Sequence, residues 1–268
     1  MLGAAELRLR CASVGRFLAN ANRSLDRLHG LVGSSGCGVL LTDSDGVVLD
    51  QRCSPADALV FKEWGLWQGA DWSEEAEGTN GIGTCLSENR QVIVHRDEHF
   101  HARNIAMSCI DAPVYGPRGE LLGALDVSSA RADQTACLNA LIGATVHQAA
   151  KQIEADLFRA EFSQARIVVV EGGHVGSGLF AIDKDDIVVG ATRDARKSFG
   201  LPLSGLFAPR PAYDLLIGEQ SVPDFEEAAK SVVVQALARS GGNVSKAART
   251  LGIGRTTLYR RMKRLRIS

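Results

Sequence analysis

Side chains able to pair with phosphate groups and base edges are concentrated at the C-terminal end of the sequence. Residues 228–268 contain ten Lys or Arg and no Asp or Glu. Arg and Lys bind phosphate oxygens or guanine edges, and Thr can hydrogen-bond a base or contact a thymine methyl group. This chemistry predicts a site for double-stranded DNA. The residues expected to form it are Asn243, Arg255, Thr256, Thr257, Tyr259, Arg260 and Lys263.

Three short helices are expected to position these side chains. The first begins near Pro223 and ends at Gly241-Gly242, because glycine tolerates a left-handed cap. Asn243 is a good N-cap for the second, and a turn at 252–254 leads to a third over about 255–265. The apolar stripe of the first helix comprises Phe225, Ala229, Val232, Val233, Ala236 and Leu237, and that of the third comprises Leu258, Met262 and Leu265.

Charge is divided unevenly along the chain. The totals, 30 Lys or Arg against 31 Asp or Glu, give a net charge of −1, but outside residues 228–268 there are 20 basic and 31 acidic residues. An acidic body with a basic end favours a nucleic-acid partner for that end. No run of 18 apolar residues occurs, so no membrane partner is expected. Six scattered cysteines without a CxxC pair favour a cytoplasmic protein.

Three histidines and one cysteine raise the question of a metal site. His95, His99 and His101 precede Cys109, and together they could bind iron, zinc or a haem group. The alternative is a surface loop with one histidine hydrogen-bonded to the core. Cys109 itself could line a pocket, sense oxidants or be an inert buried thiol. The structural interpretation is preferred, so no metal or other cofactor is assigned.

Residues 1–160 are expected to form an α+β domain, in which helices flank an antiparallel sheet. A helix is expected over about 6–31, and Asp45-Gly46 predicts a hairpin turn. "QVIVHR" is another strand, and "DAPVYGPRGELLGALDVSS" predicts two more joined by a glycine turn. A long helix over about 137–162 has an apolar stripe that could pack on the domain or form a parallel dimer seam.

The C-terminal segment "GNVSKAARTLGIGRTTLYRRMKRLRI" closely resembles the Fis-type helix-turn-helix that ends many bacterial enhancer-binding activators. The resemblance extends along nearly the whole segment. It implies a homodimer that binds an inverted-repeat operator, with the first helix helping to build the dimer.

Three stretches of the body resemble the GAF domain of the acetoin-catabolism-regulator type of activator. They are "LLTDSDGVVLD", "WSEEAEGTNGIGTCLSENRQVIVHRDEHF" and "SCIDAPVYGPRGELLGALDVSS", between about residues 32 and 157. The resemblance implies a small-molecule effector bound between the sheet and its covering loops. The side chains assigned to that pocket are Trp72, His99, Cys109 and Asp126, although Trp72 could equally belong to the core.

The glycine-rich stretch "EGTNGIGT" is expected to turn the backbone into a helix beside that pocket. No GK[ST] follows it, so it is not a phosphate-binding P-loop. No GxxxxGK[ST] occurs elsewhere either, whereas the enhancer-binding activators carry an ATPase domain between sensor and helix-turn-helix. Energy-coupled promoter opening is therefore excluded, and action by occupancy is expected, by blocking or recruiting RNA polymerase.

The expected organisation has four parts: a GAF-like sensor at 1–160, a partial PAS-like segment at 161–205, a linker at 206–222 and the helix-turn-helix at 223–268. The expected function is a ligand-responsive, sequence-specific transcriptional regulator. Two alternatives remain. One is a ligand-blind architectural DNA-binding protein similar to Fis. The other is a GAF-type methionine sulfoxide reductase that would use Cys85 and Cys109.

Overall fold

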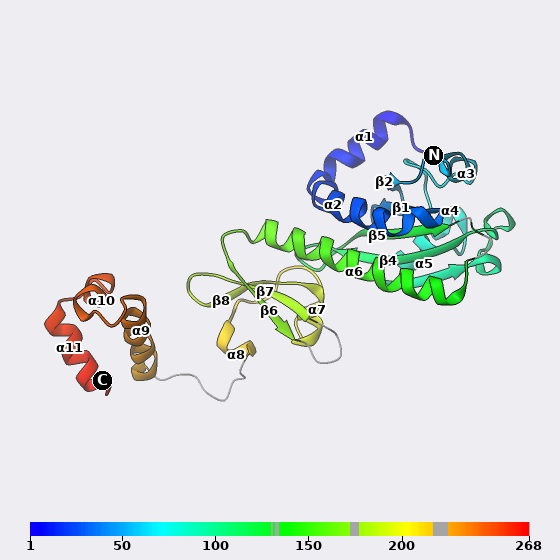
Figure 1. Cartoon of the computed structure of the whole chain (residues 1–268). Helices are drawn as coiled ribbons and strands as arrows, with labels where there is room; N and C mark the ends of the chain where they lie inside the picture. The colour runs from blue at the N-terminus through cyan, green and yellow to red at the C-terminus, as the bar shows by residue number, and fades with distance from the viewer. Residues whose placement is uncertain (130, 132–133, 172–176, 217–224, 268) are drawn as a thin grey trace. The chain divides into compact units, whose positions relative to one another are not determined.

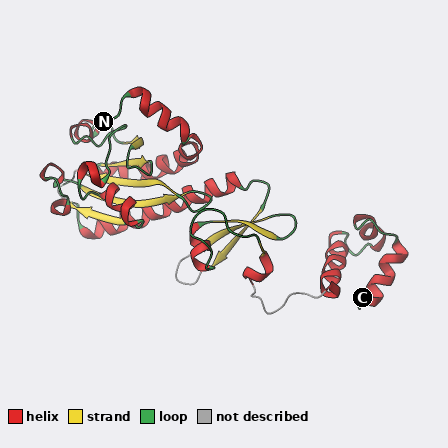
Figure 2. Ribbon diagram, turned by 180° about the vertical axis from the view of Figure 1, so that it is seen from behind, coloured by secondary structure: helices red, strands yellow, loops and turns green. Residues whose placement is uncertain are grey.

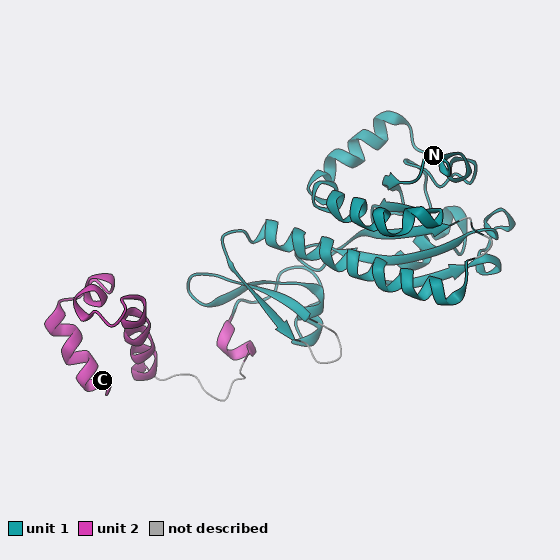
Figure 3. Cartoon of the chain, viewed as in Figure 1, with its two compact units in different colours: residues 1–210 teal, residues 211–268 magenta. Residues whose placement is uncertain are grey.

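The computed structural model describes residues 1–129, 131, 134–171, 177–216 and 225–267, which form two compact units, 1–210 and 211–268 (Figure 3). Helices and antiparallel strands occur together (Figures 1 and 2), which confirms the expected α+β class. Among the described residues no helix is long and apolar enough to cross a bilayer. The finer boundaries expected after residues 160, 205 and 222 stay predictions.

The larger sheet of the first unit has five antiparallel strands in the order β2-β1-β5-β4-β3. Its strands are β1 (Cys37–Thr42), β2 (Val48–Arg52), β3 (Val92–His95), β4 (Ser108–Tyr115) and β5 (Leu121–Ser129). The hairpin at Asp45-Gly46 is confirmed. Gly46 has a φ of +87°, and the Asp43 carboxylate accepts hydrogen bonds from the backbone of Asp45 and Val47, both at 3.0 Å. The strand pair joined by a glycine turn is confirmed as β4 and β5.

Six helices and three 3-10 turns accompany this sheet. They are α1 (Ala4–Ser13), α2 (Gly15–Val32), η1 (Gly33–Ser35), α3 (Ala58–Glu63), α4 (Glu74–Glu77), α5 (Gly81–Glu88), η2 (Arg96–Glu98), η3 (Ala102–Asn104) and α6 (Ala136–Glu161). The helical N-terminus expected over about 6–31 is confirmed, and it is divided into two helices that meet at Val14. Val14 leaves helical geometry with φ −112° and ψ 23°, where a β-branched residue followed by glycine disfavours the helix.

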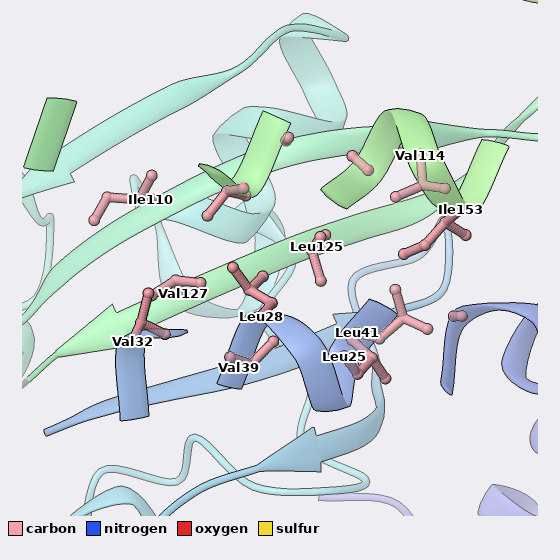
Figure 4. Packing of buried hydrophobic residues seen from close by; sticks show 14 of the residues in the cluster. Leu25, Leu28, Val32, Val39, Leu41, Ile110, Val114, Leu125, Val127 and Ile153 are labelled. Carbon is pink, nitrogen blue, oxygen red and sulfur yellow. The ribbon is translucent and has the colours of Figure 1, made fainter. Parts of the chain in front are cut away.

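Both faces of the five-stranded sheet are covered, and side chains alternate between them. Helices α2 and α6 cover one face, where Val39 and Leu41 of β1 meet Leu125 of β5 (Figure 4). Leu40, between the two β1 residues, points to the opposite face and packs with α5 and the loops. A strand buried on both faces is expected to be apolar throughout. The polar residues of β4 and β5 are therefore exceptions that need a cause.

A second, smaller sheet has the strand order β6-β7-β8-β9. Its elements are β6 (Arg166–Glu171), β7 (Ser177–Ile182), β8 (Ile187–Ala191), α7 (Arg193–Ser198) and β9 (Arg210–Pro211), and α8 (Ala212–Leu216) follows. The expected strand, Asp-rich turn, strand and short helix are present as β7, β8 and α7. The C-terminal end of α6 packs Phe158 against Leu179 of β7, so α6 contributes to the cores of both sheets.

The second unit ends in three helices, α9 (Phe225–Arg239), α10 (Val244–Thr250) and α11 (Arg255–Arg264) (Figure 1). All three are at the predicted places, although Pro223 lies outside the described residues. Gly241 and Gly242 have φ of +60° and +79°, so a glycine cap ends α9 as expected. Their small core comprises Val233, Ala236, Ala247, Ala248, Leu258 and Leu265.

Candidate functional site

The last helix, α11, separates apolar from cationic side chains. Leu258 is fully buried and Leu265 is 6% exposed, so one face of α11 packs into the small core. The opposite side is exposed and carries Arg255, Thr256, Tyr259, Arg260 and Lys263. These five residues are called the α11 surface below. Thr257, predicted with them, is half-buried.

The α11 surface keeps its charge because few acids lie near it. Among the described residues, Arg255, Arg260 and Lys263 have no acidic partner; Arg264 pairs with Glu226 at 3.7 Å. Arg255 instead lies over the Tyr259 ring, 5.5 Å from its centroid, and donates to the Tyr259 hydroxyl at 3.4 Å. An α-helix fits into the major groove of DNA, so a helix with unpaired cations along one side can present them to the phosphates and base edges there.

Asn243 has a structural task at the start of α10. Its side-chain oxygen accepts a hydrogen bond from the Lys246 backbone at 3.0 Å, which satisfies one of the free amides of the helix start. Its side chain is nevertheless exposed. The N-cap predicted from the sequence is confirmed, and the DNA contact assigned to the same residue stays a prediction.

The apolar stripe expected on α9 is only partly used inside the unit. Val233 and Ala236 are buried against α10 and α11. Phe225 is 85% exposed and Val232 is 53% exposed, so only part of the stripe packs inside the unit. By the 3.6-residue period Phe225 lies on the same side of α9 as the buried Ala236, so this part of the stripe is apolar surface that the core of the unit does not cover.

A second candidate site is buried inside the sensor sheet. Five polar side chains from β4, β5 and the loop after η2 meet on the face covered by α5. They are His99, Cys109, Asp111, Asp126 and Ser128, called the buried polar cluster below. None is more than 4% exposed. Three of the four side chains assigned to an effector pocket, His99, Cys109 and Asp126, are therefore brought together.

The hydrogen-bond partners in this cluster determine which atoms donate a proton and which accept one. His99 Nδ1 lies 2.9 Å from the Arg96 carbonyl oxygen, which can only accept, so Nδ1 carries the proton. His99 Nε2 is then the acceptor for the Cys109 thiol at 3.3 Å. Burial lowers the pKa of His99, which favours this neutral form. The Ser128 hydroxyl lies 3.0 Å from Asp126 Oδ1 and 3.2 Å from Cys109 Sγ.

Two carboxyl groups lie directly opposite each other across β4 and β5. Asp111 and Asp126 are register partners and are completely buried. Both Asp111 oxygens and Asp126 Oδ2 lack a hydrogen-bond donor among the described residues. Burial and the adjacent carboxylate raise the pKa of Asp111 well above its usual range, and burial raises that of Asp126 to about 7. One proton shared between the two oxygens avoids two adjacent buried negative charges.

The glycine-rich stretch forms the wall that faces this carboxyl pair. The expected turn into a helix is confirmed, and Asn80 caps α5 by accepting a hydrogen bond from the Gly83 backbone at 2.9 Å. A Cβ at Gly81 would lie 2.0 Å from Asp111 Oδ2 and 2.5 Å from the Cys109 Cβ. Glycine is therefore required at residue 81, because the α5 backbone lies directly against the cluster.

The remaining predicted residues lie elsewhere. His95 contacts the Ser108 hydroxyl at 2.6 Å, and His101 stacks edge-on against Phe100. In the part of the chain that the structure describes, no group of three His, Cys, Asp or Glu side chains is placed to hold a metal ion. Trp72 is buried in the same apolar cluster as Cys109, and its indole donates to the Gly65 carbonyl at 3.0 Å.

The environment of the cysteines disfavours nucleophilic chemistry. Cys85 and Cys109 are both buried, and burial together with the nearby Asp111 and Asp126 carboxylates raises the pKa of each thiol. A thiolate is the nucleophilic form of cysteine, and here it is strongly disfavoured. This observation does not favour a sulfoxide reductase.

Asp111, Ser128 and Gly81 were not singled out from the sequence. The alternation within a strand contains part of the signal, because Asp111 follows Cys109 by two residues and must share its face. Ser128 follows Asp126 in the same way. Which residue of β5 lies opposite each residue of β4 depends on the register of the two strands, and the sequence does not specify that register.

Comparison with protein families assigns both parts of the chain. The GAF domain family matches residues 18–153, from α2 to α6, and the family described as bacterial regulatory protein, Fis family, matches residues 224–265. The second match contains the whole of α11.

Individual relatives support the same division. The acetoin catabolism regulatory protein of Cupriavidus necator is 36% identical over 118 residues, which are 44% of this chain and 18% of that protein. The acetoin dehydrogenase operon transcriptional activator AcoR of Bacillus subtilis is 35% identical over 112 residues, 42% of this chain and again 18% of the relative. The matched segment thus spans about a fifth of each curated relative.

One solved structure shares the fold. The chain is similar to one in a crystal structure of the E. coli DhaR(N)-DhaL complex, with a TM-score of 0.54 and 15% sequence identity. The superposition covers 90% of this chain and 78% of the other. At this identity the likeness concerns the fold alone.

Proposed function

Because the chain belongs to the GAF domain family and ends in a segment of the bacterial Fis family, we propose that it is a ligand-responsive, sequence-specific DNA-binding regulator of transcription. The observation that carries the proposal is the α11 surface, an exposed row of cations for which the described residues supply no acidic partner. Two such surfaces in a homodimer would read the two halves of an inverted repeat, and a cytoplasmic location would be consistent with that DNA partner.

Regulation by occupancy follows from the composition of the chain between its two matched segments. No GxxxxGK[ST] sequence occurs there or elsewhere in the chain, so the ATP-driven step of enhancer-binding activators has no phosphate-binding loop in these residues. The protein would then act by blocking RNA polymerase, by recruiting it or by competing for a site. It would do so without catalysis of its own.

The effector site in this proposal is the buried polar cluster. Its unsatisfied carboxyl oxygens would accept hydrogen bonds from a small molecule, whose entry requires α5 to move because the α5 backbone lies directly against the cluster. Because α6 packs on the sensor sheet and continues to the second sheet, a change in its packing is a physical route from effector to DNA-binding domain. A coupling of about 1–3 kcal/mol between the two sites is typical of such systems.

The proposal is tested by gel retardation with genomic fragments at low ionic strength. We expect a preferred fragment with a palindromic core, and an affinity that falls steeply as salt increases. Equal retardation of all fragments would instead favour an architectural, ligand-blind protein. Mass spectrometry of the purified protein then tests for a co-purifying effector, and the preferred fragment serves to measure whether that compound changes the affinity.

A further inference from the structure

A cleft outside both candidate sites lies where α6, α7 and the end of β4 meet. It has a volume of about 350 Å³ and belongs entirely to the first unit. The charged and aromatic side chains of its lining on which its chemistry depends are Tyr115, His147, Lys151, Arg193, Asp194 and Lys197, and Leu203 lies beside them. We call it the α6–α7 cleft. Neither family resemblance assigns it a role.

Cations converge on one aromatic ring in the wall of this cleft. The Arg193 guanidinium lies over the Tyr115 ring, 4.2 Å from its centroid, and donates to the Gly119 carbonyl at 3.0 Å. The Lys151 ammonium lies 5.8 Å from the same centroid. Tyr115 is 5% exposed and its hydroxyl donates to the Asn89 carbonyl, so the ring is held in place under these charges.

The acids around the cleft are already used by other cations. Lys151 pairs with both Glu154 and Asp194, each at 2.9 Å, and Arg90 at the rim pairs with Glu88. Arg193 and Lys197 are left without an acidic partner in the described part of the chain.

The remaining two cations lie close together. Arg193 and Lys197 are four residues apart on α7, which places them on one face of that helix, and like charges at this spacing repel each other. An anion between them would remove that repulsion.

We propose that the α6–α7 cleft binds a small organic anion, whose phosphate or carboxylate oxygens contact Arg193 and Lys197. Arginine presents several donors in a planar fork, which suits the paired oxygens of either group. Leu203 and the Tyr115 ring offer an apolar wall for the body of the ligand, and the volume suits a small metabolite. His147 stands at the same wall, and burial and the Lys151 charge lower its pKa, so it contributes a neutral ring there.

An anion in this cleft would contact both the sensor domain and α7, so its binding could affect how the two are packed. Arg193 and Lys197 belong to α7 beside the second sheet, whereas Lys151 and Tyr115 belong to the sensor domain. A ligand that contacts both sides would reinforce the link that the Lys151–Asp194 ion pair already makes between α6 and α7. The site is separate from the buried polar cluster, so it stands even if the effector proposed above binds elsewhere.

The test uses the full chain and two probes, inorganic pyrophosphate and citrate, in titration calorimetry at low ionic strength. We expect saturable 1:1 binding of at least one probe, and the stronger probe indicates whether the ligand is a phosphate or a carboxylate. The decisive variant is Lys197→Gln. This side chain is exposed and has no ion-pair partner among the residues that the structure describes, so its loss should not disturb the fold, and we expect binding about tenfold weaker. Arg193→Gln should weaken binding further, with tryptophan fluorescence as the check on folding.

Two control proteins exclude nonspecific binding. Lys184→Gln removes an equal charge from the β7–β8 turn, where Lys184 pairs with Asp185, and should bind like the wild type. Arg255→Ala with Arg260→Ala removes charge from the α11 surface, which could bind the same anions, and should also bind normally. Absence of binding, unchanged binding in Lys197→Gln, or loss of binding in either control protein would overturn the proposal.

Discussion

The buried polar cluster of the sensor and the α11 surface each hold five polar side chains, in opposite surroundings. On α11 the side chains are exposed and the cations keep their charge. In the sheet, burial makes Asp111 and Asp126 weak acids and keeps the His99 ring neutral. Residue type alone therefore describes the chemistry of the α11 surface, whereas the chemistry of the cluster is set by its environment.

The two sites are also held in place by different means. The α11 surface depends on one helix, packed through Leu258 on a small core. The buried polar cluster depends on the β4–β5 register, the cap of α5 and the loop that carries His99. A change in the first should therefore act locally on binding, and a change in the second should affect the stability of the whole sensor.

The largest expected effect follows from removing two cations of the α11 surface. Arg255→Ala with Arg260→Ala should weaken binding to the preferred DNA fragment by about 100-fold or more, because each specific base contact is worth about 1–3 kcal/mol. Helix content by circular dichroism should not change, since both side chains are exposed. The affinity is measured by gel retardation at fixed salt.

A matched control separates base contacts from net charge. Lys230→Ala with Arg239→Ala removes the same charge from exposed positions on α9 and should weaken binding far less. Equal losses of affinity in the two double variants would mean that only the total charge matters for DNA binding. The α11 surface would then not be the part of the protein that recognises the DNA sequence.

The second prediction concerns the pH dependence of the sensor. The carboxyl pair has raised pKa values in the folded state, so its contribution to stability is complete below the ordinary aspartate pKa of about 4 and is lost as pH rises through 7. The contribution of this pair to the free energy of unfolding should fall over that interval, by up to about 1.4 kcal/mol per pH unit for one proton. In Asp111→Asn the slope should be smaller, and the variant should be the more stable protein above pH 7.

Urea unfolding followed by tryptophan fluorescence measures this effect in the first unit, since Trp64, Trp67 and Trp72 all lie there. Asp97→Asn, at an exposed position, is the control. Glu154, whose pKa is raised to about 7 by burial, adds a slope common to all three proteins. If Asp111→Asn follows the wild-type slope, the carboxyl pair does not share a proton.

The contrast between the two regions also explains what the sequence could predict. The α11 helix, its glycine-capped neighbour and the Asn243 cap are encoded within a few residues, so periodicity and cap residues were sufficient. Asp111 and Asp126 are 15 positions apart in the sequence, and only the strand register brings them together. The requirement for glycine at residue 81 depends on the same long-range contact. Most of the sensor's strands were found from alternation and turn signals, but the partners of their buried polar residues were not.

The smallest expected effect concerns Asn243, an exposed residue with both a predicted DNA contact and an observed structural role. Asn243 was predicted to contact DNA, and the structure gives its side chain the N-cap of α10. Asn243→Ala should lower the stability of the second unit by about 1 kcal/mol and speed hydrogen exchange of the Lys246 amide, whose bond it removes. Asn243→Ser should preserve the cap. Asn243→Asp should preserve it too, because a negative charge is favourable at a helix N-terminus.

The serine and aspartate variants then separate capping from DNA binding. If Asn243 only caps α10, both should show wild-type exchange at Lys246 and wild-type DNA affinity. If its exposed side also lies against a phosphate, Asn243→Asp should exchange normally but bind DNA more weakly, since the new charge repels the backbone of the duplex. Weaker binding by the serine variant, with normal exchange, would indicate a direct hydrogen bond from the amide. The cap and the contact can thus be measured independently at a single position, which the buried polar cluster does not allow because every substitution there also changes the stability of the sheet.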